Sequence, residues 1–256
     1  MRDAEREQVD AAFERIRAAC TRGAAPQGDE FPEWTREGIE DLGEFFDGTA
    51  HLWDARFGDG YQFLHTATAD QIPVTDEAIT ILDVGCGTGL ELQFIFERAP
   101  NALVTCLDQA PRMLDEVRRK YADRLSQISL VEASCIEWPK GLPAFDFALS
   151  ILCLHHFPPD TKREVYSSIR GALKDTGAYI EGDQMVLPEI EADSLALFEA
   201  WVAKLPGGRL GAWNYDIRLS VATNRGLLLD AGFSSCEKVY DDNDDGPNRH
   251  AVLVAR

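Results

Sequence analysis

The stretch AITILDVGCGTG, residues 78–89, decides the fold of this chain. Its first part, AITILDVG (78–85), is a continuous apolar run, which is typical of a strand buried on both faces of a parallel sheet. Its second part, GCGTG (85–89), leads into a segment that reads as a helix over 88–98. Glycines at such a turn let the backbone approach a ligand closely, and the helix N-terminus offers unpaired N–H groups. We therefore interpret residues 78–98 as a strand, a ligand-binding loop and a helix.

Strands and helices continue to alternate after this loop. A C-terminal pair of stretches, SSCEKVYD and HAVLVAR, is typical of an antiparallel hairpin around an acidic turn. Alternating strands and helices build right-handed βαβ units. The sequence thus predicts an α/β fold: a Rossmann-like, doubly wound, mostly parallel sheet with a C-terminal antiparallel hairpin. Further strands are expected at 102–108, 128–134, 145–154 and 177–183, and helices at 111–125, 162–174, 189–205 and 215–230.

The first 75 residues follow a different pattern. Apolar positions at helical spacing predict helices over 3–20, 34–46 and about 49–71, the last interrupted at the glycines of 58–60. We expect residues 1–75 to form an N-terminal helical lid. Residues 76–256 would then form the main domain, with a helical cap insertion at about 184–222.

Composition limits the class of protein and its partners. The hydrophobic fraction of 45% is ordinary for a globular protein, and no apolar run approaches the ~20 residues of a membrane span. The charged N-terminus lacks the apolar core of a signal peptide, so we expect a cytoplasmic protein. A net charge of −19 disfavours a nucleic-acid partner, because phosphate backbones attract Lys and Arg clusters. A homodimer is left open.

No metal site is expected. The six cysteines lack the paired spacing of a zinc site and read as reduced, mostly buried thiols. The acidic stretch 241–246 matches the first half of a calcium loop, but Val252 stands where that loop needs an acidic ligand. A solvated hairpin turn is the better interpretation of this stretch.

The spacing of the glycines narrows the choice of ligand. Dinucleotide sites use GxGxxG, whereas here Gly89 comes one position early and residue 90 is Leu. The next strand ends in Asp108, where an acid accepts hydrogen bonds from ribose hydroxyls. Asp108 suits both NAD and S-adenosylmethionine, so the residues by themselves indicate an adenosine-type cofactor.

Four segments together resemble one family. ILDVGCGTG, CLDQAPRMLDEVRRK, FDFALSILCLHHF and LLLDAGF resemble, in this order, the motifs of class I S-adenosylmethionine-dependent methyltransferases. The resemblance covers about residues 78–256 and is closest to small-molecule enzymes of the ubiquinone/menaquinone type. It implies S-adenosyl-L-methionine as cofactor and methyl transfer to O, N, C or S of a small-molecule acceptor.

The resemblance also implies a set of cofactor-binding residues. The glycines would line the methionine and ribose moieties, Asp83 would face the methionine amino group, and Asp108 would hold the ribose. Ser134 stands where the family commonly has an Asp that bonds the adenine amino group. The full implied set is Asp83, Gly85, Cys86, Gly87, Gly89, Asp108, Gln109, Met113, Ser134, Cys135 and Leu152.

Methyl transfer relies mainly on positioning and desolvation, and it needs a base only when the nucleophile must lose a proton. His155 is the candidate base, with a structural role of both histidines as the alternative. We expect one of His155 and His156 to face the pocket while the other packs away. Glu181 and Asp183 would end the fifth strand, either binding a cationic acceptor or hydroxyl or capping the following turn. Candidate acceptor-binding residues, each with core or cap packing as the alternative, are Trp53, Tyr61, His65, Trp213 and Tyr215.

Two other functions remain open at this point. One is a non-methylating use of the same cofactor, such as that of a carboxy-S-adenosylmethionine synthase, in which His155, Glu181 and Arg218 would matter. The other is a non-catalytic domain that binds the cofactor as a sensor or assembly partner.

Overall fold

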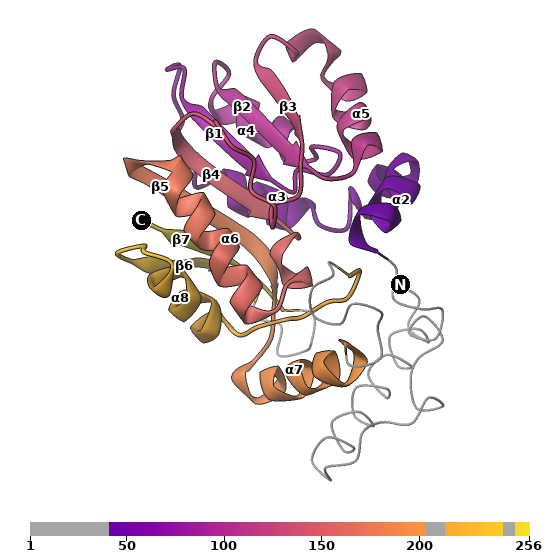
Figure 1. Ribbon diagram of the computed structural model, residues 1–256. Helices are drawn as coiled ribbons and strands as arrows, with labels where there is room; N and C mark the ends of the chain where they lie inside the picture. Colours follow the sequence, from indigo (N-terminus) through magenta and orange to yellow (C-terminus); the bar gives the residue numbers. More distant parts are fainter. Residues whose placement is uncertain (1–40, 203–212, 243–248) are drawn as a thin grey trace.

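The computed structural model describes residues 41–202, 213–242 and 249–256, which contain a seven-stranded sheet (Figure 1). The strand order is β3-β2-β1-β4-β5-β7-β6; the first five strands are parallel, and β7 runs antiparallel to β5 and β6. The predicted α/β fold with its C-terminal hairpin is therefore confirmed. The strands are β1 (Thr80–Val84), β2 (Leu103–Asp108), β3 (Ile128–Glu132), β4 (Phe145–Ile151), β5 (Leu173–Met185), β6 (Cys236–Asp241) and β7 (Arg249–Ala255).

Helices cover both faces of the sheet, and each face has its own apolar core. On one face the core includes Val165 and Leu228, from α6 and α8. On the other it includes Leu64, Ile95 and Val117, from α3, α4 and α5. The α-helices are α2 (Leu42–Phe57), α3 (Gln62–Ala69), α4 (Leu92–Arg98), α5 (Pro111–Lys120), α6 (Pro159–Ala172), α7 (Pro188–Val202) and α8 (Val221–Asp230), with short 3-10 turns η3 (Ala122–Arg124) and η4 (Leu154–His156).

The strand order reverses between β1 and β4. From β1 the chain proceeds outward through β2 and β3, and from β4 it proceeds the other way through β5. Ligands bind at such a switch point, beyond the carboxyl ends of the strands. Here the loop 85–89 follows β1, and the segment 152–156 follows β4. Leu152 has a φ of +50°, a strained conformation for a residue with a Cβ, and it turns the chain from β4 into η4.

Some boundaries differ from the predicted ones for tertiary reasons. β5 continues to Met185, because β7 pairs with it along Tyr179–Met185. α2 runs through residues 46–49, where a break between two helices was predicted. α8 begins only at Val221, where the Ser220 hydroxyl caps it by accepting from the Thr223 N–H. The predicted helix over 3–20 and most of that over 34–46 lie outside the described residues.

Candidate functional site

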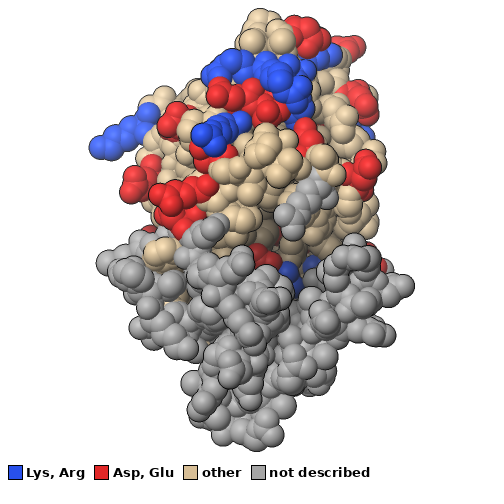
Figure 2. All heavy atoms as spheres, turned by 90° about the vertical axis from the view of Figure 1, so that its right-hand side faces the viewer, with Lys and Arg blue, Asp and Glu red and all other residues tan. Residues whose placement is uncertain are grey.

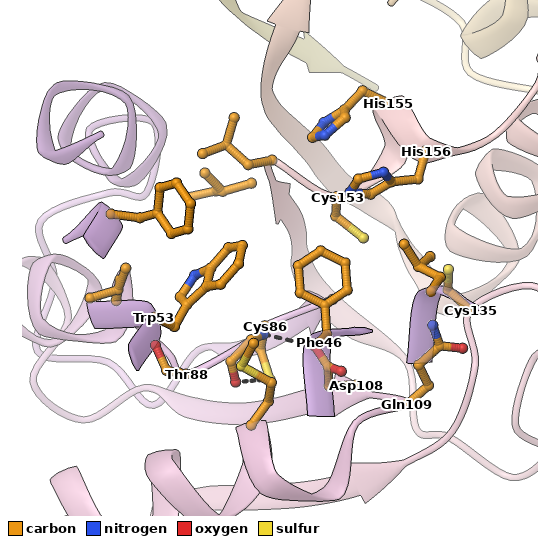
Figure 3. A pocket seen from close by; sticks show the side chains of 18 of the residues that line it. Phe46, Trp53, Cys86, Thr88, Asp108, Gln109, Cys135, Cys153, His155 and His156 are labelled. Atoms are coloured by element: carbon orange, nitrogen blue, oxygen red, sulfur yellow. Dashed lines mark hydrogen bonds between the residues drawn. The ribbon is translucent and has the colours of Figure 1, made fainter. Parts of the chain in front are cut away.

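A cavity of about 350 Å³ opens at the switch point. Its wall comes from the loops after β1, β2 and β4, from helix α2, and from the segment 214–218. Figure 3 shows aromatic side chains of α2 reaching into this space, between Asp108 and Gln109 on one side and the two histidines of η4 on the other. The cavity therefore joins the glycine loop to the histidines.

The glycine loop fits close approach of a ligand. Gly85 and Gly87 have φ values of +69° and +51°, which residues with a Cβ rarely adopt. A Cβ on Gly85 would lie 2.2 Å from the Cys153 sulfur, whereas a Cβ on Gly87 would meet nothing within 4 Å. Gly85, Cys86 and Gly87 all line the cavity. Gly89 was predicted to contact the cofactor, but it is not part of the cavity wall and packs against Leu92 and Val117.

Asp108 ties the loop to the end of β2. Its carboxylate accepts the Gly87 N–H at 2.8 Å and the Ala110 N–H at 2.9 Å. Burial raises the pKa of Asp108 to about 6, although these backbone bonds act in the opposite direction. A buried carboxylate at a cavity wall suits a ligand with two neighbouring hydroxyl groups, as in a ribose.

The cofactor affinity is therefore expected to depend on pH. Below pH 6 the carboxyl of Asp108 holds a proton, which must leave before both oxygens can accept ribose hydroxyls. We expect the Kd of S-adenosylhomocysteine to rise by up to about tenfold per pH unit below that value. Isothermal titration calorimetry between pH 5 and 8 measures this, and Asp108→Asn should bind weakly with a flat profile over the same range. An unchanged wild-type Kd between pH 5 and 7 contradicts this role of Asp108.

The other predicted cofactor residues divide into two groups. Gln109, Met113, Cys135 and Leu152 line the cavity, as Figure 3 shows for Gln109 and Cys135. Ser134 and Asp83 do not. Of the first group, Gln109 directly follows Asp108 and Met113 lies in α5, so both are suited to flank an adenine ring next to the ribose.

The opposite end of the loop is polar. Thr88 and Glu91 line the cavity there, and Nδ1 of His65 lies 3.4 Å from a carboxylate oxygen of Glu91. The Thr88 hydroxyl donates at 2.5 Å to Asp54 of α2, and Lys120 of α5 donates to the same carboxylate at 2.7 Å. These bonds fasten α2 over the loop. His65, predicted at the acceptor, lines the cavity beside Glu91.

A buried His–Asp pair stands at the end of β4 and β5. Nδ1 of His155 and a carboxylate oxygen of Asp183 are 2.6 Å apart, and Asp183 also accepts the His155 backbone N–H at 3.0 Å. Burial tends to lower the pKa of His155, but the charge and bond of Asp183 outweigh it and raise the pKa above the usual value. Asp183 engages Nδ1, so Nε2, which lies 3.5 Å from a carboxylate oxygen of Asp216, is the ring nitrogen available to a ligand.

Both histidines line the cavity, so the prediction that one of them packs away was wrong. The 3-10 turn η4 places His155 and His156 side by side, with ring centroids 4.2 Å apart. Burial and the neighbouring charge of His155 lower the pKa of His156 to about 4, so its ring is neutral at pH 7. The two rings therefore differ in charge although they are adjacent in sequence.

The segment 213–218 brings Asp216 and Arg218 to the histidines. The Ile217 N–H donates to the His155 carbonyl at 2.5 Å, which holds this segment against η4. His155, His156 and Asp216 each offer one ligand atom within 4.8 Å of the others, which among the described residues is the group that could hold a metal ion. Arg218 lies 2.7 Å from the Asp216 carboxylate, and its positive charge opposes a divalent cation.

Glu181 lies outside the cavity, contrary to its predicted catalytic role. It is fully buried under α6, where Lys162 lies 2.8 Å away and the Tyr166 hydroxyl donates at 2.6 Å. The cause is the length of β5: the strand ends at Met185, so Glu181 is inside it and Asp183 is near its end.

The aromatic wall also differs in part from the predicted one. Trp53 and Tyr61 line the cavity as expected, together with Phe46 and Phe57. Trp213 and Tyr215 do not; Trp213 bridges to Asp41, and Tyr215 packs against Phe198. Asn214 and Asp216, the residues next to them in sequence, line the cavity instead. Some cavity residues were not predicted from the sequence, among them Phe45, Thr88, Glu91, Gln184, Asn214 and Asp216. For Asn214 and Asp216, the only signal in the sequence was the alternation of side chains along an extended segment.

Known proteins share this architecture. Residues 81–177 match a family model described as a methyltransferase domain. The chain is 25% identical over 179 residues, 65% of its length and 64% of the relative's, to trans-aconitate 2-methyltransferase of Azoarcus sp. (strain BH72). It is 27% identical over 103 residues, 39% of its length and 37% of the relative's, to malonyl-[acyl-carrier protein] O-methyltransferase of Paenibacillus sp. (strain JDR-2).

A solved structure, the DhpI–SAM–HEP complex, has the same fold. It superimposes with a TM-score of 0.63 at 20% identity, covering 83% of this chain and 94% of that one. The chain spans between about a third and two thirds of the length of the two curated relatives described above. Within the described residues, none of the helices has the length and apolar character that crossing a membrane requires.

Proposed function

Since the chain carries a class I S-adenosylmethionine-dependent methyltransferase domain, we propose that it methylates a hydroxyl oxygen of a small-molecule acceptor, with His155 as general base. The observation that carries this proposal is His155, a residue of the cavity wall whose Nδ1 is held at 2.6 Å by the buried Asp183. A carboxylate that holds one ring nitrogen of a histidine orients the other one to take a proton. The O-methyltransferase among the curated relatives agrees with an oxygen acceptor.

The cavity fits S-adenosylmethionine. Gly87 leaves open space above the loop, Asp108 suits the ribose, and Gln109, Met113 and Cys135 would surround the adenine. When bound, the cofactor supplies a methyl group on a positively charged sulfur, which is already a good leaving group. The protein therefore has to position the acceptor and remove its proton, and it need not activate the cofactor itself.

The residues around His155 support these two tasks. Asp183 fixes the ring with its Nδ1 side engaged, which leaves Nε2 toward the cavity. Asp216, 3.5 Å from Nε2, stabilises the imidazolium formed when His155 takes the acceptor's proton. Phe46 and Trp53 of α2, with ring centroids 5.1 Å apart, exclude water from the transfer. We propose that α2 acts as the lid in this way.

The acceptor is expected to be small and polar at one end. Gln184 and Asn214 line the cavity near the histidines, where a hydroxylated compound would be bound by hydrogen bonds. Figure 2 shows Lys and Arg side chains interleaved with Asp and Glu on the face that carries α2 and α5, a pattern that does not favour a nucleic acid. Arg118 and Arg119 of α5, for example, pair with Asp115 and Glu116. A homodimer and a cytoplasmic location remain predictions.

Mass spectrometry tests the proposal. We expect the full chain, incubated with S-adenosylmethionine and a library of small hydroxy compounds, to yield products 14 mass units heavier and S-adenosylhomocysteine in equal amount. EDTA should leave the yield unchanged, because Arg218 disfavours a metal at Asp216. Products 44 units heavier than S-adenosylmethionine itself would support the carboxylating alternative, and binding without turnover would support a sensor. Loss of activity with EDTA would contradict the metal-free mechanism.

A further inference from the structure

We propose that Glu91 provides the negative charge that binds the α-ammonium group of S-adenosylmethionine. The proposal rests on the proposed function, since it concerns the cofactor of that reaction. It assigns to Glu91 the contact that the family resemblance assigned to Asp83, the acidic residue at the end of β1.

Glu91 lies at the end of the glycine loop, directly before helix α4. Its side chain lines the cavity, although the residue is only 3% exposed. One carboxylate oxygen is 3.4 Å from Nδ1 of His65, and the carboxyl of Asp83 also hydrogen-bonds Glu91. A buried carboxylate at the wall of a cavity is suited to bind a cationic group of a ligand, because the ligand's charge compensates the cost of burying its own.

Asp83 is less suited to the contact. It is 1% exposed and does not line the cavity. Burial, with the charge of Glu91 as the next cause, raises the pKa of Asp83 well above its usual value. Burial would also raise the pKa of Glu91, but the bond and charge of His65 outweigh it and lower that pKa. Since two adjacent buried carboxyls do not both ionise readily, the charged one is the one that faces the cavity.

The direction of the cavity matches the shape of the cofactor. Asp108 and Gln109 lie at one end of the loop, where the ribose and adenine are expected, and Glu91 lies at the other end, past Gly87 and Thr88. S-adenosylmethionine, with adenosine at one end and an amino acid at the other, would lie along the loop with its amino acid toward Glu91. The ammonium would lie at Glu91, because the carboxylate of the same amino acid would be repelled there.

Glu91→Gln separates this role from a structural one. S-adenosylhomocysteine carries the ammonium, whereas 5′-methylthioadenosine lacks the amino-acid part and keeps the adenosine and the sulfur. Calorimetry on the full chain should show a 10- to 100-fold weaker affinity of the variant for S-adenosylhomocysteine, as expected for loss of a charge-assisted bond. The affinity for 5′-methylthioadenosine should stay within twofold of wild type.

Glu97→Gln is the matched control, because Glu97 is an exposed residue of helix α4, which begins directly after Glu91. It should leave the affinities for both ligands unchanged. If Glu91→Gln weakens both ligands equally, or weakens neither, the proposal is overturned. If the wild-type chain binds neither ligand, the proposed function fails instead.

A second measurement needs no variant and so holds even if Glu91→Gln does not fold. An S-adenosylhomocysteine analogue without its amino group presents only a carboxylate to the polar end of the loop. The wild-type chain should bind this analogue more weakly than 5′-methylthioadenosine, since Glu91 repels the carboxylate. An affinity for the analogue equal to that for S-adenosylhomocysteine would exclude an ammonium contact at Glu91.

Discussion

Replacement of His155 by alanine is expected to lower kcat by about 10²- to 10⁴-fold, the usual contribution of a general base. His155 lines the acceptor end of the cavity, and its Nδ1 is held by Asp183 at 2.6 Å. Without the ring, the acceptor hydroxyl has no positioned group to take its proton. Steady-state kinetics with the acceptor found by mass spectrometry measures the effect. The Kd of S-adenosylhomocysteine should change by less than about threefold.

The pH profile distinguishes a base from a packing residue. His155 must be neutral to accept a proton, and Asp183 raises its pKa above the usual value. The wild-type rate should therefore rise with pH through that raised pKa and then level off. Asp183→Asn removes the negative charge, so the rising limb should move to lower pH while the plateau falls. A His155→Ala variant with wild-type kcat, or an unmoved limb in Asp183→Asn, would contradict the base assignment.

Replacement of Lys162 by methionine is expected to destabilise the protein by about 3–5 kcal/mol, because it leaves the Glu181 carboxylate buried without its partner. The two charged atoms are 2.8 Å apart, and the side chains are 1% and 0% exposed. Burial already raises the pKa of Glu181, with Lys162 opposing the rise. In the variant, the carboxyl takes up a proton at low pH. The loss of stability measured by urea unfolding should thus be larger at pH 8 than at pH 5.

A second substitution should reverse part of this loss. The double variant Lys162→Met with Glu181→Gln has no buried charge, and the amide can still accept from the Tyr166 hydroxyl that now bonds Glu181 at 2.6 Å. It should be more stable than Lys162→Met alone, with a kcat close to wild type at a temperature where it is folded. If Glu181→Gln instead abolishes turnover in a stable protein, Glu181 has the catalytic role that its position under α6 argues against.

Local patterns were sufficient for the order of elements. The apolar run before Gly85 predicted β1, and the alternation of strands and helices predicted the sheet and its C-terminal hairpin. Asp108 was found because an acid at the end of the second strand must reach the loop after the first. Such features depend on a few consecutive residues, and the parallel sheet then brings the ends of its strands together.

Other features depend on contacts between distant residues. The pairing of β7 lengthens β5, and this sets Asp183 beside His155 while Glu181 lies under α6 with Lys162. In the same way, the bond from Ile217 to His155 brings Asp216 into the cavity in place of its neighbour Tyr215.

The sequence by itself thus determined the fold and the cofactor loop of this protein, because strand, loop and helix signals are local. Only the tertiary structure decided which acids face the cavity, which of them are charged, and which are paired in the core. The position and pKa of a carboxyl group depend on its burial and its nearest charges, and these come from segments far apart in the chain.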